Sequence, residues 1–333
     1  MNKILFIASF VLTLIFMDLI MRFTEIQSIS SSVFDKDPIK RKKNVNLINF
    51  NEGFYWGGIN ENGFKGDTLD TNNEKNIFLI GGSFVEANQL FNRDHFMNDI
   101  KRVIEDTLKK KYSFINRGLG EQNLSDIYLS FLNVYNESSL FLIFVNPDRL
   151  HLHDYEVQNK SYVYLDNTLK VKTFEKKYVK DFLTKILHNS TLFQLIKKAI
   201  KRIQLGQFYE IIFGKFIYNF FYISGDSSKS IAMKNEYKLM SEINKKILIE
   251  MNKPNASIIF IKSPMKAQEI NYKKFFNENK IDIIDLSVPL NNLKNNNIDP
   301  YFWKVTNING HWNHLAHREV GRYLGQEIIG KIR

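Results

Sequence analysis

The 333-residue sequence contains no cysteine. This absence excludes disulfide bonds, thiolate nucleophiles and cysteine-based zinc sites. It says nothing about compartment, because an exported protein need not contain disulfides. With only 16 glycines and 6 prolines, and with 44% hydrophobic residues, the chain is neither a collagen-like fibre nor intrinsically disordered. The composition is that of a globular protein with enough apolar material for a sizeable core.

Acidic residues are the minority among the charged residues. The chain has 46 Lys and Arg against 35 Asp and Glu, a formal net charge of +11, with a local concentration at 40–43 (KRKK). This excess favours an acidic neighbour such as anionic lipid or a glycan. No helix-turn-helix, zinc-finger or RNA-binding signature is present, so nucleic acid is not an expected partner.

Long apolar runs are missing except at the amino terminus, which argues against a polytopic membrane protein. Residues 4–21 hold a single charge, Asp18, and their 18 residues are about the minimum for crossing a bilayer core of ~30 Å. Lys3 precedes them, as in an export signal, and no Ala-x-Ala site follows at the usual distance. We expect residues 1–23 to be an uncleaved signal anchor with an exported body; a cleaved signal peptide is the alternative.

Residues 24–75 show no sustained period and are interpreted as a linker with an irregular lead-in. From residue 76 onward, short apolar runs alternate with helical periodicity, which predicts an α/β domain over 76–333. Such a domain has three layers, with a mostly parallel sheet covered on both faces. The expected strands are 76–80, 113–116, 140–145, 257–261 and 281–286, and apolar faces mark helices at 96–108, 237–251 and after residue 313.

A helical insertion is expected at about 176–225, where the alternation stops. Its first half is basic, and its second half contains the aromatic run 208–223. Two interpretations remain open for this insertion. It is either an ordinary helical subdomain that caps the sheet, or an amphipathic lid that lies on membrane lipid.

Four candidate functional residues follow core elements. Ser83 comes after two glycines at the end of the first strand, Gly118 follows the second strand, and Asn146 follows the third. His311 precedes the last helix. In parallel sheets, sites form beyond the carboxyl ends of the strands. A serine, a glycine N–H, an asparagine amide and a histidine in such positions supply a nucleophile, a base and two oxyanion donors.

The order of these blocks resembles the SGNH (GDSL-type) hydrolase superfamily, and specifically its membrane-anchored bacterial members. The resemblance runs from Asn60 to the carboxyl terminus. Residues 59–66 (INENGFKG) are similar to the Asn-Ser-x-Gly-Phe-Arg-Gly lead-in of these proteins, and 81–85 (GGSFV) to Gly-Asp-Ser-Phe. Asn116-x-Gly118 is similar to their second block, and 311–317 (HWNHLAH) to their His-Trp-Asn-x-x-Gly-His string.

The resemblance implies a flavodoxin-like fold, Ser83 as nucleophile and His311 as general base. Ser83, Gly118 and Asn146 would form the oxyanion hole. Asn309 stands where the family has the aspartate that orients the histidine; it could hold the ring itself, or a backbone carbonyl or Asp299 could replace it. An amide in place of that aspartate costs a serine protease about 10⁴-fold in kcat.

We therefore expect an extracytoplasmic serine esterase or O-acyltransferase that acts on an acylated envelope polysaccharide, held in the bacterial cytoplasmic membrane by one span. The alternative is a non-catalytic, membrane-tethered polysaccharide-binding or assembly protein with a degenerate site. No organic cofactor is implied. His311, His314 and His317 recur every three residues, but on a helix the third would turn away from the first, so no metal site is expected.

Overall fold

The computed structural model describes residues 2–23, 26–28, 41, 43–49, 52–65, 75–120, 122–151, 163–166, 168–173, 190, 192, 196, 239–263 and 266–332. Apart from 190, 192 and 196, the insertion expected at 176–225 lies outside the described residues.

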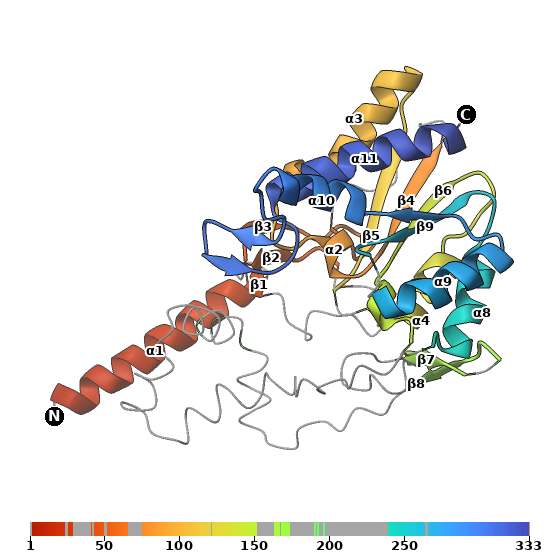
Figure 1. The fold of residues 1–333 in the computed structure, drawn as a ribbon. Coiled ribbons are helices and arrows are strands. Elements are labelled where there is room, and N and C mark those ends of the chain that lie inside the picture. The colour runs from red at the N-terminus through yellow and green to blue at the C-terminus, as the bar shows by residue number, and fades with distance from the viewer. Residues whose placement is uncertain are drawn as a thin grey trace.

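The centre of the molecule is a five-stranded, all-parallel sheet (Figure 1). When the strands are numbered in chain order, they lie across the sheet in the order 2-1-3-4-5, which is the flavodoxin-like arrangement. The predicted α/β class and parallel sheet are confirmed, and every expected strand overlaps an observed one. The strands are β4 (Asn76–Gly81), β5 (Ser113–Gly118), β6 (Leu140–Val145), β9 (Ala256–Phe260) and β10 (Ile283–Asp285).

Helices cover both faces of this sheet, because alternate strand residues point into two separate hydrophobic cores. One core joins the sheet to α3 (Phe96–Leu108), α10 (Ser287–Asn295) and α11 (His314–Ile332). The other joins it to α4 (Leu124–Leu132), α8 (Glu242–Met251) and α9 (Lys266–Glu278). The apolar faces at 96–108 and 237–251 correspond to α3 and α8.

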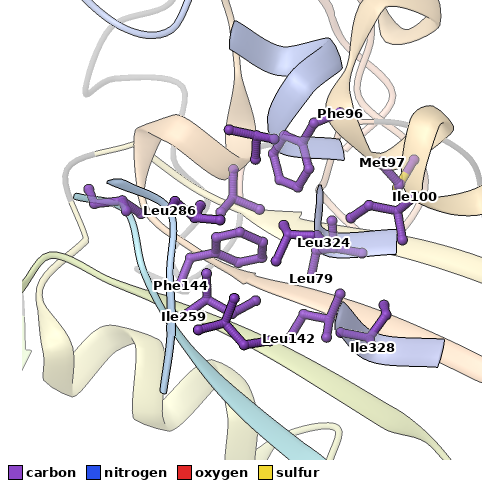
Figure 2. Close-up of a cluster of buried hydrophobic side chains, with 14 of the residues drawn as sticks. Leu79, Phe96, Met97, Ile100, Leu142, Phe144, Ile259, Leu286, Leu324 and Ile328 are labelled. Carbon is purple, nitrogen blue, oxygen red and sulfur yellow. The ribbon is translucent and has the colours of Figure 1, made fainter. Parts of the chain in front are cut away.

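The first core is dense around the carboxyl-terminal helix (Figure 2). Phe144 and Leu79 from the sheet meet Phe96 of α3 and Leu324 of α11, and all four side chains are at most 1% exposed. Phe96 and Phe144 lie with ring centroids 5.3 Å apart. The close packing of α3 and α11 ties the end of the chain, and with it the residues just before α11, to the sheet.

The lead-in is not irregular throughout, since it contains a small three-stranded sheet of β1 (Ile26–Ser28), β2 (Asn46–Asn49) and β3 (Tyr55–Gly58). Its buried side chains are Val45, Leu47, Tyr55 and Ile59. Strands this short show little periodicity, which is why they could not be predicted from the residue pattern. The remaining short elements are α2 (Ser83–Glu86), η2 (Asn92–Asp94), η3 (Pro147–Arg149), β7 (Val163–Leu165), β8 (Val171–Thr173), β11 (Phe302–Trp303) and β12 (Ile308–Asn309).

The apolar amino terminus forms helix α1 (Asn2–Phe23) (Figure 1). Within the described part of the chain, no helix has both the length and the apolar character needed to cross a bilayer. The structure thus gives the predicted single span no support.

The core beneath α11 generates a stability prediction. Leu324 is 0% exposed, so Leu324→Ala removes buried methyl groups and leaves a cavity, which should lower the free energy of unfolding by about 2–5 kcal/mol. Urea denaturation followed by circular dichroism measures this loss. Leu315→Ala in the same helix is the matched control, because Leu315 is 42% exposed and should change stability by about 0.5 kcal/mol or less. Equal effects of the two substitutions would contradict the packing described here.

Candidate active site

Ser83 lies at the carboxyl ends of the strands of the parallel sheet. It is the first residue of α2, a one-turn helix that begins directly after β4. The backbone N–H groups of Val85 and Glu86 donate to the carbonyl of Gly82 at 3.0 and 3.1 Å, which fixes the turn. Strands β4 and β6 are the neighbours between which the strand order reverses, and ligands bind at such a point.

His311 faces Ser83 from the loop between β12 and α11. Its Nε2 lies 2.7 Å from the Ser83 Oγ. The ring packs against Phe84 with centroids 4.7 Å apart, and Trp303 Nε1 donates to the His311 carbonyl at 2.9 Å. Two residues that are 228 positions apart in the chain are thereby held in hydrogen-bond contact.

The other side of the imidazole meets Glu52, a residue of the lead-in. His311 Nδ1 lies 2.9 Å from both Glu52 carboxylate oxygens, and the His311 backbone N–H donates to Oε2 at 2.8 Å. Burial raises the pKa of Glu52, but the hydrogen bonds and charge of His311 outweigh burial and hold that pKa below its usual value. An ionised carboxylate only accepts hydrogen bonds, so His311 Nδ1 carries the proton that it donates to Glu52. His311 Nε2 is then unprotonated, and its lone pair accepts from the Ser83 hydroxyl.

A close approach at Gly310 makes room for this carboxylate. A Cβ on Gly310 would lie 2.3 Å from the carboxyl carbon of Glu52, so any side chain there would displace the acid. Thr306 Oγ1 also donates to the backbone carbonyl of Glu52, and Gly53 packs against the Trp303 ring. The β11–β12 hairpin and the 52–53 turn therefore hold one another in place.

Asn309 does not orient the histidine. It is an exposed residue of β12, where it pairs with Phe302 across the hairpin, and its side chain makes no hydrogen bond to His311 in the described part of the chain. The Asp299 carboxylate is turned elsewhere, because its Oδ1 accepts from the Tyr301 N–H at 2.8 Å. The structure instead places Glu52 at His311 Nδ1. Glu52 precedes His311 by 259 positions, so sequence reasoning missed it. The one available signal is Gly310, since a glycine next to the histidine indicates that another group packs closely there.

The predicted oxyanion donors do not all come together. The Gly118 N–H donates to Asn116 Oδ1 at 2.8 Å, and a Cβ on Gly118 would lie 2.2 Å from the Glu86 nitrogen. Gly118 is therefore a close-packing residue whose N–H is occupied. Ser83 N–H and Asn146 Nδ2 keep their donors available, since the described residues offer neither an acceptor. Asn146 Oδ1 accepts from the Asp148 N–H at 3.2 Å, which orients the amide.

The other histidines of the carboxyl-terminal string have different surroundings. His317 is fully buried, where desolvation holds its pKa well below the usual value, and its Nδ1 accepts from the Phe96 N–H at 3.4 Å. His314 is exposed on the first turn of α11. In the part of the chain that the structure describes, no group of three or more His, Cys, Asp or Glu residues could hold a metal ion.

No protein-family model and no curated protein sequence matches the chain. Solved structures of hydrolases are similar to it. One is a member of the lipolytic G-D-S-L family from Veillonella parvula, with 13% identity, a TM-score of 0.35, and coverage of 76% of this chain and 97% of that one. The acetyl xylan esterase AlAXEase has 12% identity and a TM-score of 0.37, covering 76% and 99%. The lipase/acylhydrolase from Enterococcus faecalis has 12% identity and a TM-score of 0.37, covering 77% and 96%.

The geometry predicts that Glu52 orients His311. Glu52→Gln keeps the shape but replaces the obligate acceptor with an amide that can hold the wrong tautomer, so kcat for a small ester should fall by about 10⁴-fold. The measurement is steady-state hydrolysis of 4-nitrophenyl acetate by purified protein.

Glu61→Gln is the matched control for this prediction, because Glu61 is an exposed glutamate of the same lead-in and should leave kcat unchanged. Asn309→Asp should neither raise the activity of the wild-type chain nor rescue Glu52→Gln. Rescue by Asn309→Asp would show that the acid acts from position 309 after all.

Proposed function

We propose that the protein is a serine esterase of the SGNH type that also supports O-acyl transfer. The observation that carries this proposal is the continuous line of contacts from the Glu52 carboxylate through His311 to the Ser83 hydroxyl, at 2.9 and 2.7 Å. A serine, an imidazole and a carboxylate in that order form the acid–base relay of serine hydrolases. The line of contacts ends at the carboxyl ends of the strands, where ligands generally bind in parallel α/β sheets.

In the mechanism, Ser83 Oγ attacks the carbonyl carbon of an ester while His311 Nε2 takes the hydroxyl proton. The carbonyl oxygen becomes an oxyanion, which the Ser83 N–H and the Asn146 amide stabilise. The carbon–oxygen bond to the leaving alcohol then breaks, and His311 returns its proton to that alcohol. Glu52 stays ionised and stabilises the imidazolium formed between the two transfers.

The acyl group on Ser83 is released by a second hydroxyl compound. Water attacks with His311 as base and yields the free acid, which is hydrolysis. A sugar hydroxyl attacks in the same way and yields a new ester, which is O-acyl transfer. Both outcomes use the same residues and the same acyl-Ser83 intermediate.

An acylated polysaccharide is the substrate class we propose. Support comes from a hollow of about 760 Å³ whose lining includes Gly310, the residue directly before His311. Its lining supplies amides, a carboxylate, an amine and a tyrosine ring, groups that suit a ligand rich in hydroxyls. The lining residues are Lys294, Asn297, Ile298, Asp299, Tyr301, Asn309 and Gly310.

We further propose that the enzyme works outside the bacterial cytoplasmic membrane, tethered through residues 1–23. This proposal is supported by the apolar side chains of α1, which are exposed and would gain from contact with lipid. They include Leu5, Phe6, Phe10, Leu12, Ile15, Phe16 and Leu19, each more than half exposed. Cell fractionation with protease protection of the soluble body tests this location.

The geometry removes the reason for the alternative function, a non-catalytic polysaccharide-binding protein with a degenerate site. It was suggested by the absence of an aspartate at position 309, and Glu52 now occupies the position against His311 Nδ1.

A covalent probe tests for an activated serine. Because Nε2 accepts from the Ser83 hydroxyl, the wild-type protein should react with a fluorophosphonate at Ser83, as gel fluorescence and peptide mass spectrometry would show. Ser83→Ala should abolish this label, while Ser287→Ala, a change at a serine whose hydroxyl accepts from the Ser263 hydroxyl, should retain it. Folded wild-type protein that stays unlabelled would overturn the proposed function.

The hollow lined by Asn309 and Gly310 predicts a difference between polymeric and small substrates. Asn309→Ala removes an amide that lines it, so KM for an acetylated polysaccharide such as acetyl xylan should rise, with KM for 4-nitrophenyl acetate unchanged. The rise should be about 5–10-fold, equivalent to one hydrogen bond of roughly 1 kcal/mol. Lys304→Ala, in the same hairpin but outside the lining, is the control. Equal KM values for wild type and Asn309→Ala on the polymer would contradict this use of the hollow.

A further inference from the structure

A buried ion pair lies directly behind the nucleophile. Arg41 Nε donates to Glu86 Oε1, and the two side chains are only 3% and 2% exposed. Glu86 is the last residue of the same one-turn helix that begins with Ser83. Removing two charges from water is costly before their attraction is counted, so a pair at this depth is weak evidence for a gain in stability alone.

The second oxygen of Glu86 is used as well. Glu86 Oε2 accepts from the Gly120 N–H at 2.7 Å. This contact ties α2 to the loop that follows β5. A Cβ built on Gly120 would lie 2.9 Å from Glu86 Oε2 and 4.0 Å from the Cβ of Ser83, so this part of the loop lies against the nucleophile.

Three segments therefore converge on one carboxylate. Arg41 comes from the lead-in, and its backbone N–H donates to Gly63 O at 3.0 Å within that segment. Glu86 belongs to the nucleophile turn, and Gly120 belongs to the loop after β5. Burial raises the pKa of Glu86, but the charge and hydrogen bond of Arg41, together with hydrogen bonds from Asn88 and the Gly120 N–H, outweigh burial and hold that pKa below its usual value.

The mechanism described above uses neither residue. Nothing in proton transfer or oxyanion binding requires a charged pair behind the serine. The Glu86 carboxylate is also an anion close to the site where an oxyanion develops, so Arg41 has a second effect, which is to neutralise it locally.

We propose that the Arg41–Glu86 pair is a positioning device for the proposed esterase: it fixes the loop at Gly118–Gly120 against α2, so that the Ser83 backbone N–H and hydroxyl keep their direction toward substrate. Both residues are positioning residues, since neither touches substrate or a reacting atom. The inference rests on the proposed function, but the contact that it invokes can be measured without activity.

The test compares Glu86→Ala with Glu86→Gln. Glu86→Ala releases the Gly120 N–H and leaves Arg41 without its carboxylate, so kcat for 4-nitrophenyl acetate should fall by roughly 100-fold while KM stays close to wild type. Glu86→Gln retains an oxygen that accepts from Gly120, so it should recover most of kcat when Arg41→Gln is introduced with it, removing both charges together.

Glu105→Ala is the matched control. The Glu105 carboxylate also accepts from a backbone N–H, that of Tyr112 at 3.1 Å, but it does so before β5 begins, at the end of the sheet opposite Ser83. Its loss should leave kcat unchanged. A comparable fall in kcat for Glu105→Ala would mean that general loss of structure explains both results and would overturn the proposal.

Amide hydrogen exchange at Gly120 separates this inference from the proposed function. Exchange should be slow in the wild-type protein and in the Arg41→Gln/Glu86→Gln variant, and at least tenfold faster in Glu86→Ala. If the wild-type protein hydrolyses no ester but Gly120 exchange follows this pattern, the function fails and the positioning contact stands. If Glu86→Ala retains both wild-type kcat and slow Gly120 exchange, the proposal is wrong. If Glu86→Ala does not fold, the Arg41→Gln/Glu86→Gln variant decides: a low kcat together with slow Gly120 exchange in that variant would overturn the proposal.

Discussion

The contact between the Glu52 carboxylate and the His311 imidazole is the constraint on which the site depends. It determines the tautomer of the histidine, leaves Nε2 free to accept from Ser83, and requires a glycine at position 310. The surrounding packing serves this contact. The β11–β12 hairpin supports Glu52 from one side, and the α3–α11 core holds the loop that carries His311 from the other.

The lead-in belongs to the site as much as to the amino-terminal part of the chain. Besides Glu52 and Arg41, it supplies Lys65, whose buried Nζ donates to the Ala87 and Leu90 carbonyls at 2.5 Å each. Burial lowers the pKa of Lys65 to about 7, against the opposing charges of Glu86 and Asp94. Three side chains from one segment thus contact the site: Glu52 binds His311, while Arg41 and Lys65 bind the carboxyl-terminal end of α2 and the residues after it.

Much of the fold could be predicted from the sequence, because strands buried on both faces appear as short apolar runs and long amphipathic helices show a period of three to four residues. Ser83 and His311 could be identified because each stands in a short motif next to a core element, Ser83 directly after a buried strand and His311 just before the last helix. Glu52 could not, since its partner is 259 positions away and its own neighbourhood is a sheet of strands too short to show a pattern. Gly118 and Asn309 show the limit of motif spacing: the first serves close packing and the second lies exposed on a hairpin, although both occupy the expected positions.

The distance in sequence between Glu52 and His311 also has a consequence during synthesis. A ribosome makes the amino-terminal residues first, and domains form as the chain emerges. Glu52 and Ser83 are therefore made long before His311, and the contacts among the three residues form only after residue 311 has been translated. A prematurely terminated product that ends before residue 311 would contain the proposed nucleophile Ser83 and the Glu52 carboxylate, but not the imidazole that joins them.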